Sequence, residues 1–208
     1  MKFSIVMASR LEFYPGAASN RDAKLIRAIN SVINQTYEDW ELHVIADGCQ
    51  KTIDIVQSNV KDLRLHLWKV AHTKLWSGRP RNKGIEEAQG EFIVYLDIDD
   101  VYGKDHLKII AQNLNAYDWV WYNDFRYRNK TDYWYENHCN INKAGAHGTS
   151  NICHKRNLNV FWNENDKYAH DYNFVRKLIP FSNNSKIITP EYYCCHVPGN
   201  GISGGYDI

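Results

Sequence analysis

Residues 92–100 read Phe-Ile-Val-Tyr-Leu-Asp-Ile-Asp-Asp, a run fit for a buried strand that ends in an acidic turn. An unpaired carboxylate is expensive to bury, so such a cluster needs a partner that neutralises its charge. A hard divalent cation with oxygen ligands is the usual partner, and α/β sheets bind ligands at the carboxyl ends of their parallel strands. The motif is equally compatible with a strand followed by a solvated acidic turn, so the rest of the chain must decide.

Short apolar runs alternate with helical patterns on both sides of this motif. Leu25, Ile29, Val32 and Ile33 recur at helical spacing and predict a helix with one apolar face, which Asp22 would cap. This alternation requires right-handed crossovers and predicts an α/β fold with a mostly parallel, twisted sheet flanked by helices. The expected strands are Phe3–Met7, Glu41–Ala46, Arg64–Trp68, Phe92–Leu96 and Trp119–Tyr122, and further helices are expected at Arg79–Ala88 and Leu107–Leu114.

The pattern changes after residue 123. Residues 124–134 alternate charged and aromatic side chains, as an edge hairpin does. A short strand is expected at residues 151–154 and a helix at residues 171–178. Because the chain has no repeat, linker or low-complexity segment, we expect a single domain over residues 1–208. Its first part, residues 1–105, has the rhythm of a nucleotide-binding unit, and residues 106–208 form a smaller second part.

Composition excludes several classes of protein. The chain has 208 residues and a net charge of +1, so electrostatics favour neither nucleic acid nor an anionic membrane as a partner. No apolar run approaches the ~18 residues of a transmembrane helix. The five cysteines form no C-x-x-C pair and their number is odd, which indicates free thiols in a reducing compartment. We therefore expect a cytoplasmic protein with no transmembrane segment and no nucleic-acid partner.

A series of short motifs precedes the acidic turn, and their order is more specific than any one of them. They are Ser31-Val32-Ile33-Asn34-Gln35-Thr36-Tyr37, Ala46-Asp47-Gly48-Cys49, Gly78-Arg79-Pro80-Arg81-Asn82-Lys83-Gly84 and the Gly90-Glu91 pair before the strand. In this order and spacing the chain resembles the family 2 glycosyltransferases, enzymes of the GT-A fold. The resemblance runs from residue 3 to about residue 105. It implies that residues 1–105 bind a nucleotide sugar, that residues 106–208 face the acceptor, and that the acidic turn holds a metal ion.

The resemblance also implies a donor site at the strand ends. Asp47 would accept a hydrogen bond from the nucleotide base, most simply from uracil N3–H, although an aspartate before Gly48 also suits a plain turn. Ala8, Ser9 and Arg10 would line the same base pocket. The family often has proline and threonine near the first two of these positions, so this chain departs from the family pattern there.

In the acidic turn, Asp97 would reach the ribose or a metal-bound water, and Asp99 would ligate the cation directly. Ile98 lies between them and belongs to the same donor-binding stretch. Arg81 and Asn82 open a helix that faces this turn, where the helix dipole and the guanidinium charge favour a diphosphate. Arg81 is alternatively a structural partner of Asp97 or Asp99.

Residues of the second part complete the implied machinery. Asp171 resembles the catalytic base of the family, and its alternative role is that of a carboxylate stabilised by a helix amino terminus. His170 stands where the family usually has an acid, and its role is open. His196 resembles a histidine that ligates metal in some GT-A enzymes, with a packing or solvent-facing role as the alternative. With Asp97 and Asp99 it would form a site suited to Mn²⁺, or to Mg²⁺.

The resulting hypothesis is a metal-dependent, inverting glycosyltransferase that moves a sugar from a UDP-sugar donor to an acceptor hydroxyl. UDP-glucose is the default donor, with a deoxy sugar such as rhamnose as an option, and the acceptor is a glycan or another hydroxyl compound. Two alternatives remain open. One is a non-catalytic module that binds a nucleotide sugar or a glycan, and the other is a nucleotidyltransferase. The motifs identify neither the sugar nor the acceptor.

Overall fold

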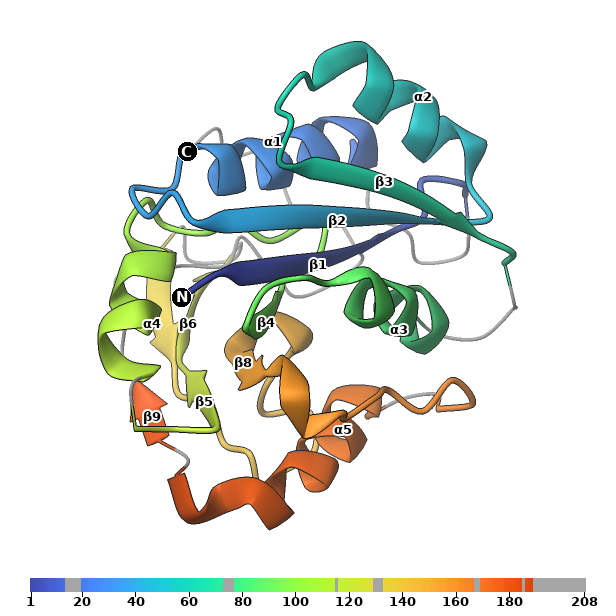
Figure 1. Ribbon diagram of the computed structural model, residues 1–208. Coiled ribbons are helices and arrows are strands. Elements are labelled where there is room, and N and C mark those ends of the chain that lie inside the picture. The colour runs from blue at the N-terminus through green and yellow to red at the C-terminus, as the bar shows by residue number, and fades with distance from the viewer. Residues whose placement is uncertain are drawn as a thin grey trace.

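A seven-stranded sheet forms the centre of the computed structural model, in the order β3-β2-β1-β4-β8-β5-β9 (Figure 1). The structure describes residues 1–13, 20–72, 77–114, 116–128, 133–166, 169–184 and 186–188. All neighbouring strands of the sheet pair in parallel except β8, which runs antiparallel to both β4 and β5. The strands are β1 (Phe3–Ser9), β2 (Trp40–Asp47), β3 (Leu65–Val70), β4 (Phe92–Tyr95), β5 (Trp119–Tyr122), β8 (Ile152–Lys155) and β9 (Lys186–Ile188). The mostly parallel sheet predicted from the sequence is therefore confirmed.

Helices cover both faces of this sheet. In Figure 1, α1 and α2 lie on one side of β1 and β2, while α3 and α5 lie on the other. The helices are α1 (Arg21–Ile33), α2 (Gln50–Asn59), α3 (Gly78–Glu87), α4 (His106–Leu114) and α5 (His170–Leu178), with short 3₁₀ turns η1 (Thr149–Asn151), η2 (Arg156–Leu158) and η3 (Ile179–Asn184). The predicted hairpin forms a separate two-stranded antiparallel sheet of β6 (Asp124–Arg128) and β7 (Tyr133–Asn137). Helix α2 was not predicted from the amino-acid sequence.

Alternation along the strands divides the core in two. Successive residues of a strand point to opposite faces, so Phe3, Ile5 and Met7 of β1 join the core beneath α1, whereas Val6 joins the core beneath α3 and α5. The apolar face predicted for the first helix is confirmed, because Leu25, Ile29 and Val32 are buried in the first core.

The start of α1 differs from the prediction. Asp22 lies within the first turn rather than at the cap. The cap position is Asn20, whose backbone is left-handed (φ 54°). The Asn20 side chain makes no capping hydrogen bond to the helix.

Close packing at Gly84 sets the position of α3. A Cβ atom built on Gly84 would lie 2.5 Å from Cγ1 of Val6 and 2.9 Å from Cδ1 of Ile45. The helix therefore lies against β1 and β2 at a distance that only glycine permits. This contact holds the amino-terminal turn of α3, with Arg81 and Asn82, beside the carboxyl ends of the strands.

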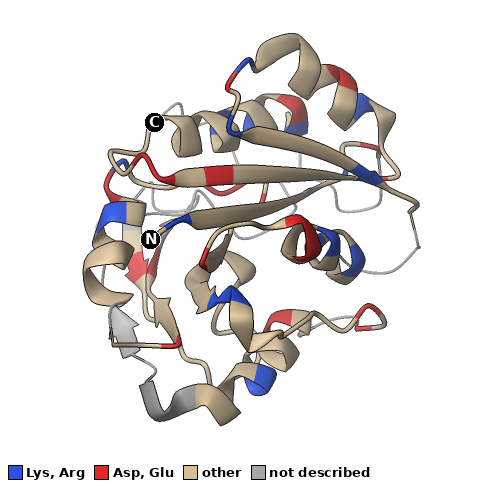
Figure 2. Ribbon diagram, viewed as in Figure 1, with Lys and Arg blue, Asp and Glu red and all other residues tan. Residues whose placement is uncertain are grey.

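Charged residues are mixed over the described chain, with basic and acidic segments interspersed along helices and strands (Figure 2). Some charged residues are buried, and one of them is Glu41 of β2, whose side chain is only 2% exposed. It accepts hydrogen bonds from Ser4 Oγ (2.6 Å) and the Gln89 backbone N–H (2.6 Å), and it pairs with Lys2 Nζ at 2.6 Å. Burial acts to raise its pKa, but these partners together with His43 outweigh burial and lower the pKa to about 2.

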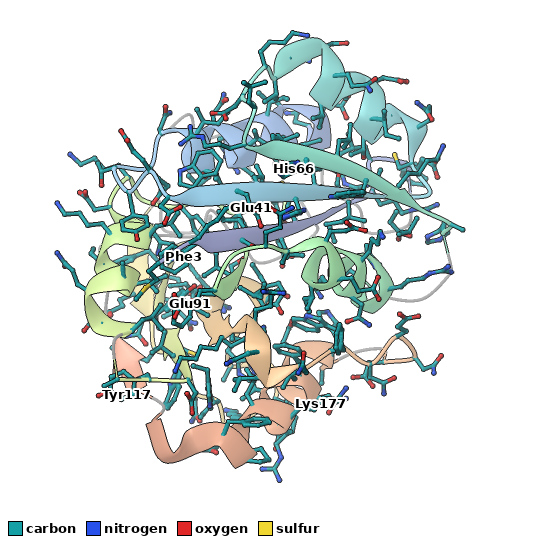
Figure 3. The ribbon with its side chains drawn as sticks, in the orientation of Figure 1. Phe3, Glu41, His66, Glu91, Tyr117 and Lys177 are labelled. Atoms are coloured by element: carbon teal, nitrogen blue, oxygen red, sulfur yellow. The ribbon has the colours of Figure 1, made fainter. Side chains whose placement is uncertain are left out.

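We expect Glu41→Gln to lower the free energy of unfolding by about 2 kcal/mol at neutral pH, because Lys2 and the backbone donors lose a charged partner. A depressed pKa contributes stability that is present above the unfolded-state value of about 4.3 and is lost as the pH falls toward the folded value. Urea unfolding at neutral pH and near pH 3 should therefore show a smaller difference from wild type in acid. Glu91→Gln, an exposed glutamate at the same end of the sheet (Figure 3), is the matched control and should have little effect.

Candidate functional site

The carboxyl ends of β1, β2 and β4 meet at one edge of the sheet. The register pairs Ser9 with Ala46 and Val6 with Tyr95, so the residues that follow these strands emerge side by side. Side chains from the amino-terminal turn of α3 and from the turn η1 contact this edge. The amino-terminal turn of α5 joins them through His170, which lies 3.2 Å from Arg81. The predicted residues Arg10, Asp47, Arg81, Asp97 and Asp171 all belong to these segments.

The acidic turn after β4 is held by hydrogen bonds from both sides. The Asp97 backbone N–H donates to Ser150 Oγ (3.2 Å), and the same hydroxyl donates to Asp100 Oδ2 (2.6 Å). From α1, Arg27 Nη2 donates to the backbone carbonyl of Asp99 at 3.1 Å. The turn is thus built to hold its carboxylates at fixed positions, and neither Ser150 nor Arg27 was predicted to take part.

The turn carries more negative charge than the protein alone offsets. Asp100 is 6% exposed. Burial, and then the charges of Asp99 and Asp97, raise its pKa well above the usual range. Within the described chain the Asp99 carboxylate has no hydrogen bond or ion pair. Oxygen ligands with an unmet need for positive charge fit a hard cation such as Mn²⁺ or Mg²⁺.

The described residues would supply this cation with two carboxylates, those of Asp99 and Asp97. No cluster of three or more histidine, cysteine, aspartate or glutamate side chains suited to a metal occurs among them. His196, the third predicted ligand, lies outside the described residues. The remaining positions around a cation would therefore be open to donor phosphates, water or His196. Ile98, between the two carboxylates, is half-buried and packs against the first core.

The predicted base pocket lies at the ends of β1 and β2. Asp47 is buried, and its Oδ2 lies 3.0 Å from Nδ1 of His72, a residue that sequence analysis did not single out. Arg10 Nη1 makes a long hydrogen bond of 3.4 Å to the Asp47 carbonyl. Ala8 is half-buried. The Ser9 hydroxyl lies 3.0 Å from Thr52 Oγ1 of α2, and a part for Ser9 in the base pocket stays a prediction.

Arg81 joins the donor side to the second part of the chain. Its guanidinium is buried, forms an ion pair with Asp97 Oδ1 at 2.9 Å and lies 4.5 Å from the centre of the Trp162 ring. Its other terminal nitrogen lies 3.2 Å from Nδ1 of His170. The ion pair that the alternative role of Arg81 requires is present, and donor binding by Arg81 stays a prediction.

Asn82 has a structural contact that sequence analysis did not anticipate. Its amide donates to the Trp162 carbonyl (3.0 Å), and its Oδ1 accepts from the Trp162 backbone N–H (2.8 Å). These two bonds fix the segment that carries the Trp162 ring against α3. Donor binding by Asn82 stays a prediction.

Asp171 lies in the first turn of α5 and is held by two neighbours. Thr149 Oγ1 donates to Asp171 Oδ1 at 2.6 Å, and His170 Nδ1 lies 2.9 Å from the same oxygen. Burial acts to raise the pKa of Asp171, but the His170 hydrogen bond, the Arg81 charge and the Thr149 hydrogen bond outweigh it and leave the pKa below the usual range. The carboxylate is therefore ionised at neutral pH and able to accept a proton.

These contacts form one polar chain, Asp97–Arg81–His170–Asp171–Thr149. His170 Nδ1 holds either a proton or a lone pair, so it serves Asp171 as a donor or Arg81 as an acceptor. This series of contacts links Asp97 of the acidic turn to the carboxylate of Asp171, which lies 74 residues further along the sequence. Such an arrangement can bind an anionic group beside the turn while a second carboxylate removes a proton nearby.

Comparison with known proteins identifies a family that this chain matches. The model of the family described as "Glycosyl transferase family 2" matches residues 17–182. The chain is 33% identical over 111 residues to the putative colanic acid biosynthesis glycosyl transferase WcaA of Escherichia coli, a match covering 51% of this chain and 39% of that protein. It is 28% identical over 114 residues to the poly(ribitol-phosphate) beta-N-acetylglucosaminyltransferase TarS of Staphylococcus aureus, covering 53% of this chain and 18% of TarS.

Solved structures show the same fold. The crystal structure of S. aureus TarS 1–349 in complex with UDP-GlcNAc matches with a TM-score of 0.72 at 20% identity, covering 99% of this chain and 62% of that one. At this identity the likeness concerns the fold, and it confirms the GT-A fold predicted from the sequence. The matched segments span well under half of the length of WcaA and TarS. No helix among the described residues has the length and apolar character needed to cross a bilayer.

Proposed function

Because this chain belongs to glycosyl transferase family 2, we propose that it transfers a sugar from a UDP-sugar donor to an acceptor hydroxyl, with a divalent cation and with inversion at the anomeric carbon. The observation that carries the proposal is the polar chain from Asp97 to Asp171. Through Arg81 and His170 it connects Asp171, the residue proposed to accept the proton, to the acidic turn where a donor diphosphate would lie.

On the donor side, Asp47 would accept the imide hydrogen of uracil, and Arg10 would support the same pocket from β1. Asp97 and Asp99 would hold Mn²⁺ or Mg²⁺ together with donor phosphate oxygens. When bound, the cation supplies Lewis-acid stabilisation of the charge that builds on the departing diphosphate. Arg81 keeps Asp97 oriented through the ion pair, and Arg27 keeps the turn in place from α1.

On the acceptor side, Asp171 would take the proton of the acceptor hydroxyl as that oxygen attacks the anomeric carbon. The bond from this carbon to the UDP oxygen breaks in the same displacement, and the configuration inverts because the attack comes from the opposite face. Thr149 and His170 orient the carboxylate for this step. Their hydrogen bonds also keep it ionised before the acceptor arrives.

The candidate donors are UDP-glucose and nucleotides of deoxy sugars such as rhamnose. Because TarS 1–349 was solved in complex with UDP-GlcNAc, a UDP-N-acetylhexosamine is a further candidate donor. Relatives named for colanic acid and poly(ribitol-phosphate) support a glycan or polyol acceptor. The cytoplasmic location predicted from the sequence stays a prediction, with which the buried free thiols of Cys49, Cys139 and Cys153 agree.

Isothermal titration of UDP into the protein tests the proposal directly, with Mn²⁺ present and then with EDTA, and with GDP and dTDP alongside. We expect UDP to bind in a metal-dependent manner and more tightly than GDP, because Asp47 and the acidic turn recognise the base and the diphosphate separately. Selective binding justifies screening UDP-sugars for transfer. If no nucleotide binds under either condition, the proposed function is wrong.

A further inference from the structure

His72 closes one side of the predicted base pocket. It follows β3, whose carboxyl end is paired with that of β2, and its Nδ1 lies 3.0 Å from Asp47 Oδ2. A carboxylate only accepts hydrogen bonds, so Nδ1 must carry the proton in this contact. The side chain of His72 is 28% exposed and that of Asp47 is 12% exposed. In this pair, Asp47 is largely buried and His72 reaches solvent at the carboxyl ends of β2 and β3.

The backbone holds this contact in place. Gly48 has a left-handed backbone (φ 63°), and a Cβ built on it would lie 2.5 Å from the Cβ and 2.9 Å from the backbone nitrogen of His72. The Gly48 N–H also donates to the Val70 carbonyl at 2.8 Å. Only glycine lets the two segments approach so closely, and the result is that the position of His72 relative to Asp47 is fixed by main-chain packing.

The contact leaves the two oxygens of Asp47 unequal. His72 occupies Oδ2, whereas Oδ1 has no hydrogen bond within the described residues. We infer that His72 is a specificity-determining residue, which orients Asp47 so that Oδ1 accepts the N3–H of uracil and discriminates against cytosine. This inference rests on the proposed uridine donor and deepens it.

The chemistry of the bases explains the discrimination. Uracil presents a hydrogen at N3, whereas cytosine presents a lone pair there, which would face a carboxylate oxygen that cannot turn away. A site built to bind an N–H group rejects the analogue lacking it, because its own polar group is left unpaired. Without His72 the carboxylate is free to rotate and to be hydrated, so UDP loses a preorganised partner and CDP loses a repulsive one.

The test compares UDP and CDP binding by calorimetry in Mn²⁺ for wild type and three variants. His72→Phe keeps a ring but removes the donor, and His72→Asn keeps a donor close to the position of Nδ1. His66→Phe is the matched control, since His66 lies on β3 (Figure 3) and stacks on His43 at a ring distance of 5.1 Å. Thermal melting of each variant verifies that it is folded.

We expect His72→Phe to bind UDP about tenfold more weakly, with the preference for UDP over CDP reduced by a similar factor. His72→Asn should recover most of both, and His66→Phe should match wild type. Unchanged UDP affinity and preference in His72→Phe, or no recovery in a folded His72→Asn, would overturn the role of His72 alone. Wild-type protein that binds neither nucleotide would overturn the proposed function as well, so the two failures are distinguishable.

Discussion

We expect Asp171→Asn to lower the turnover number by about a thousandfold, the usual contribution of a general base, and to leave UDP affinity near that of wild type. Asparagine has the size of aspartate, and its Oδ1 still accepts the Thr149 hydrogen bond. It cannot take a proton from the acceptor at neutral pH. The loss therefore falls on the chemical step rather than on donor binding.

Steady-state rates of UDP release from a panel of UDP-sugars, together with calorimetric UDP titration, measure the two effects separately. Asp166→Asn is the matched control, because Asp166 precedes α5 and its carboxylate, among the residues that the structure describes, accepts hydrogen bonds from the side chains of Asn163 and Asn173. It should retain its rate. Normal turnover by Asp171→Asn would refute the base assignment, whereas lost UDP affinity would place Asp171 on the donor side instead. A protein that bound UDP without any turnover even as wild type would favour the non-catalytic module.

Asp99→Asn weakens UDP binding and turnover together, and we expect the rate to fall by at least about a hundredfold. The substitution removes a charged ligand from the turn. The Arg27 hydrogen bond reaches the backbone carbonyl of Asp99, so the turn itself keeps its anchor. UDP affinity in the variant should no longer differ between Mn²⁺ and EDTA.

Titration of Mn²⁺ and of UDP into wild type and variant measures this effect. Asp54→Asn is the control, since Asp54 lies on α2 and accepts a hydrogen bond from Gln50. A variant that kept the metal dependence of wild type would show that the cation lies elsewhere. Retained metal dependence with a lowered rate would assign Asp99 to the sugar rather than to the metal.

Much of the fold was predictable from local patterns of apolar and polar residues. The strand at residues 92–95 and the strands before it are short apolar runs whose ends coincide with polar motifs, so their edges were predictable to within about two residues. The helix α2 was missed because only Thr52 and Val56 are buried along its length, which leaves almost no apolar periodicity. The antiparallel strand β8 between β4 and β5 was not predictable in position, because strand order depends on contacts between distant segments.

The site residues likewise fall into two groups, those predictable from local sequence and those that depend on contacts between distant segments. Asp47 is the last residue of β2, and Asp97 and Asp99 lie in the turn after β4. Parallel strands bring their carboxyl ends to one edge without further information. His72, Thr149 and Trp162 gave no signal of comparable strength, because each acts on a residue far from it in the chain. Asn82 belongs to a motif that the sequence shows clearly, but its contact was not predictable. Its side-chain amide makes two hydrogen bonds to the backbone of Trp162.

The amino-acid sequence by itself determined the α/β class, the family and the location of the acidic turn after a buried strand. These follow from periodicity and from residues adjacent in the chain. Tertiary structure decided the partners. Arg81 meets His170 at a sequence separation of 89, and Asp47 meets His72 at a separation of 25, with α2 and β3 between them. A hydrogen bond requires atoms within about 3.5 Å, and for residues so far apart in sequence that proximity exists only once the sheet and its helices have packed.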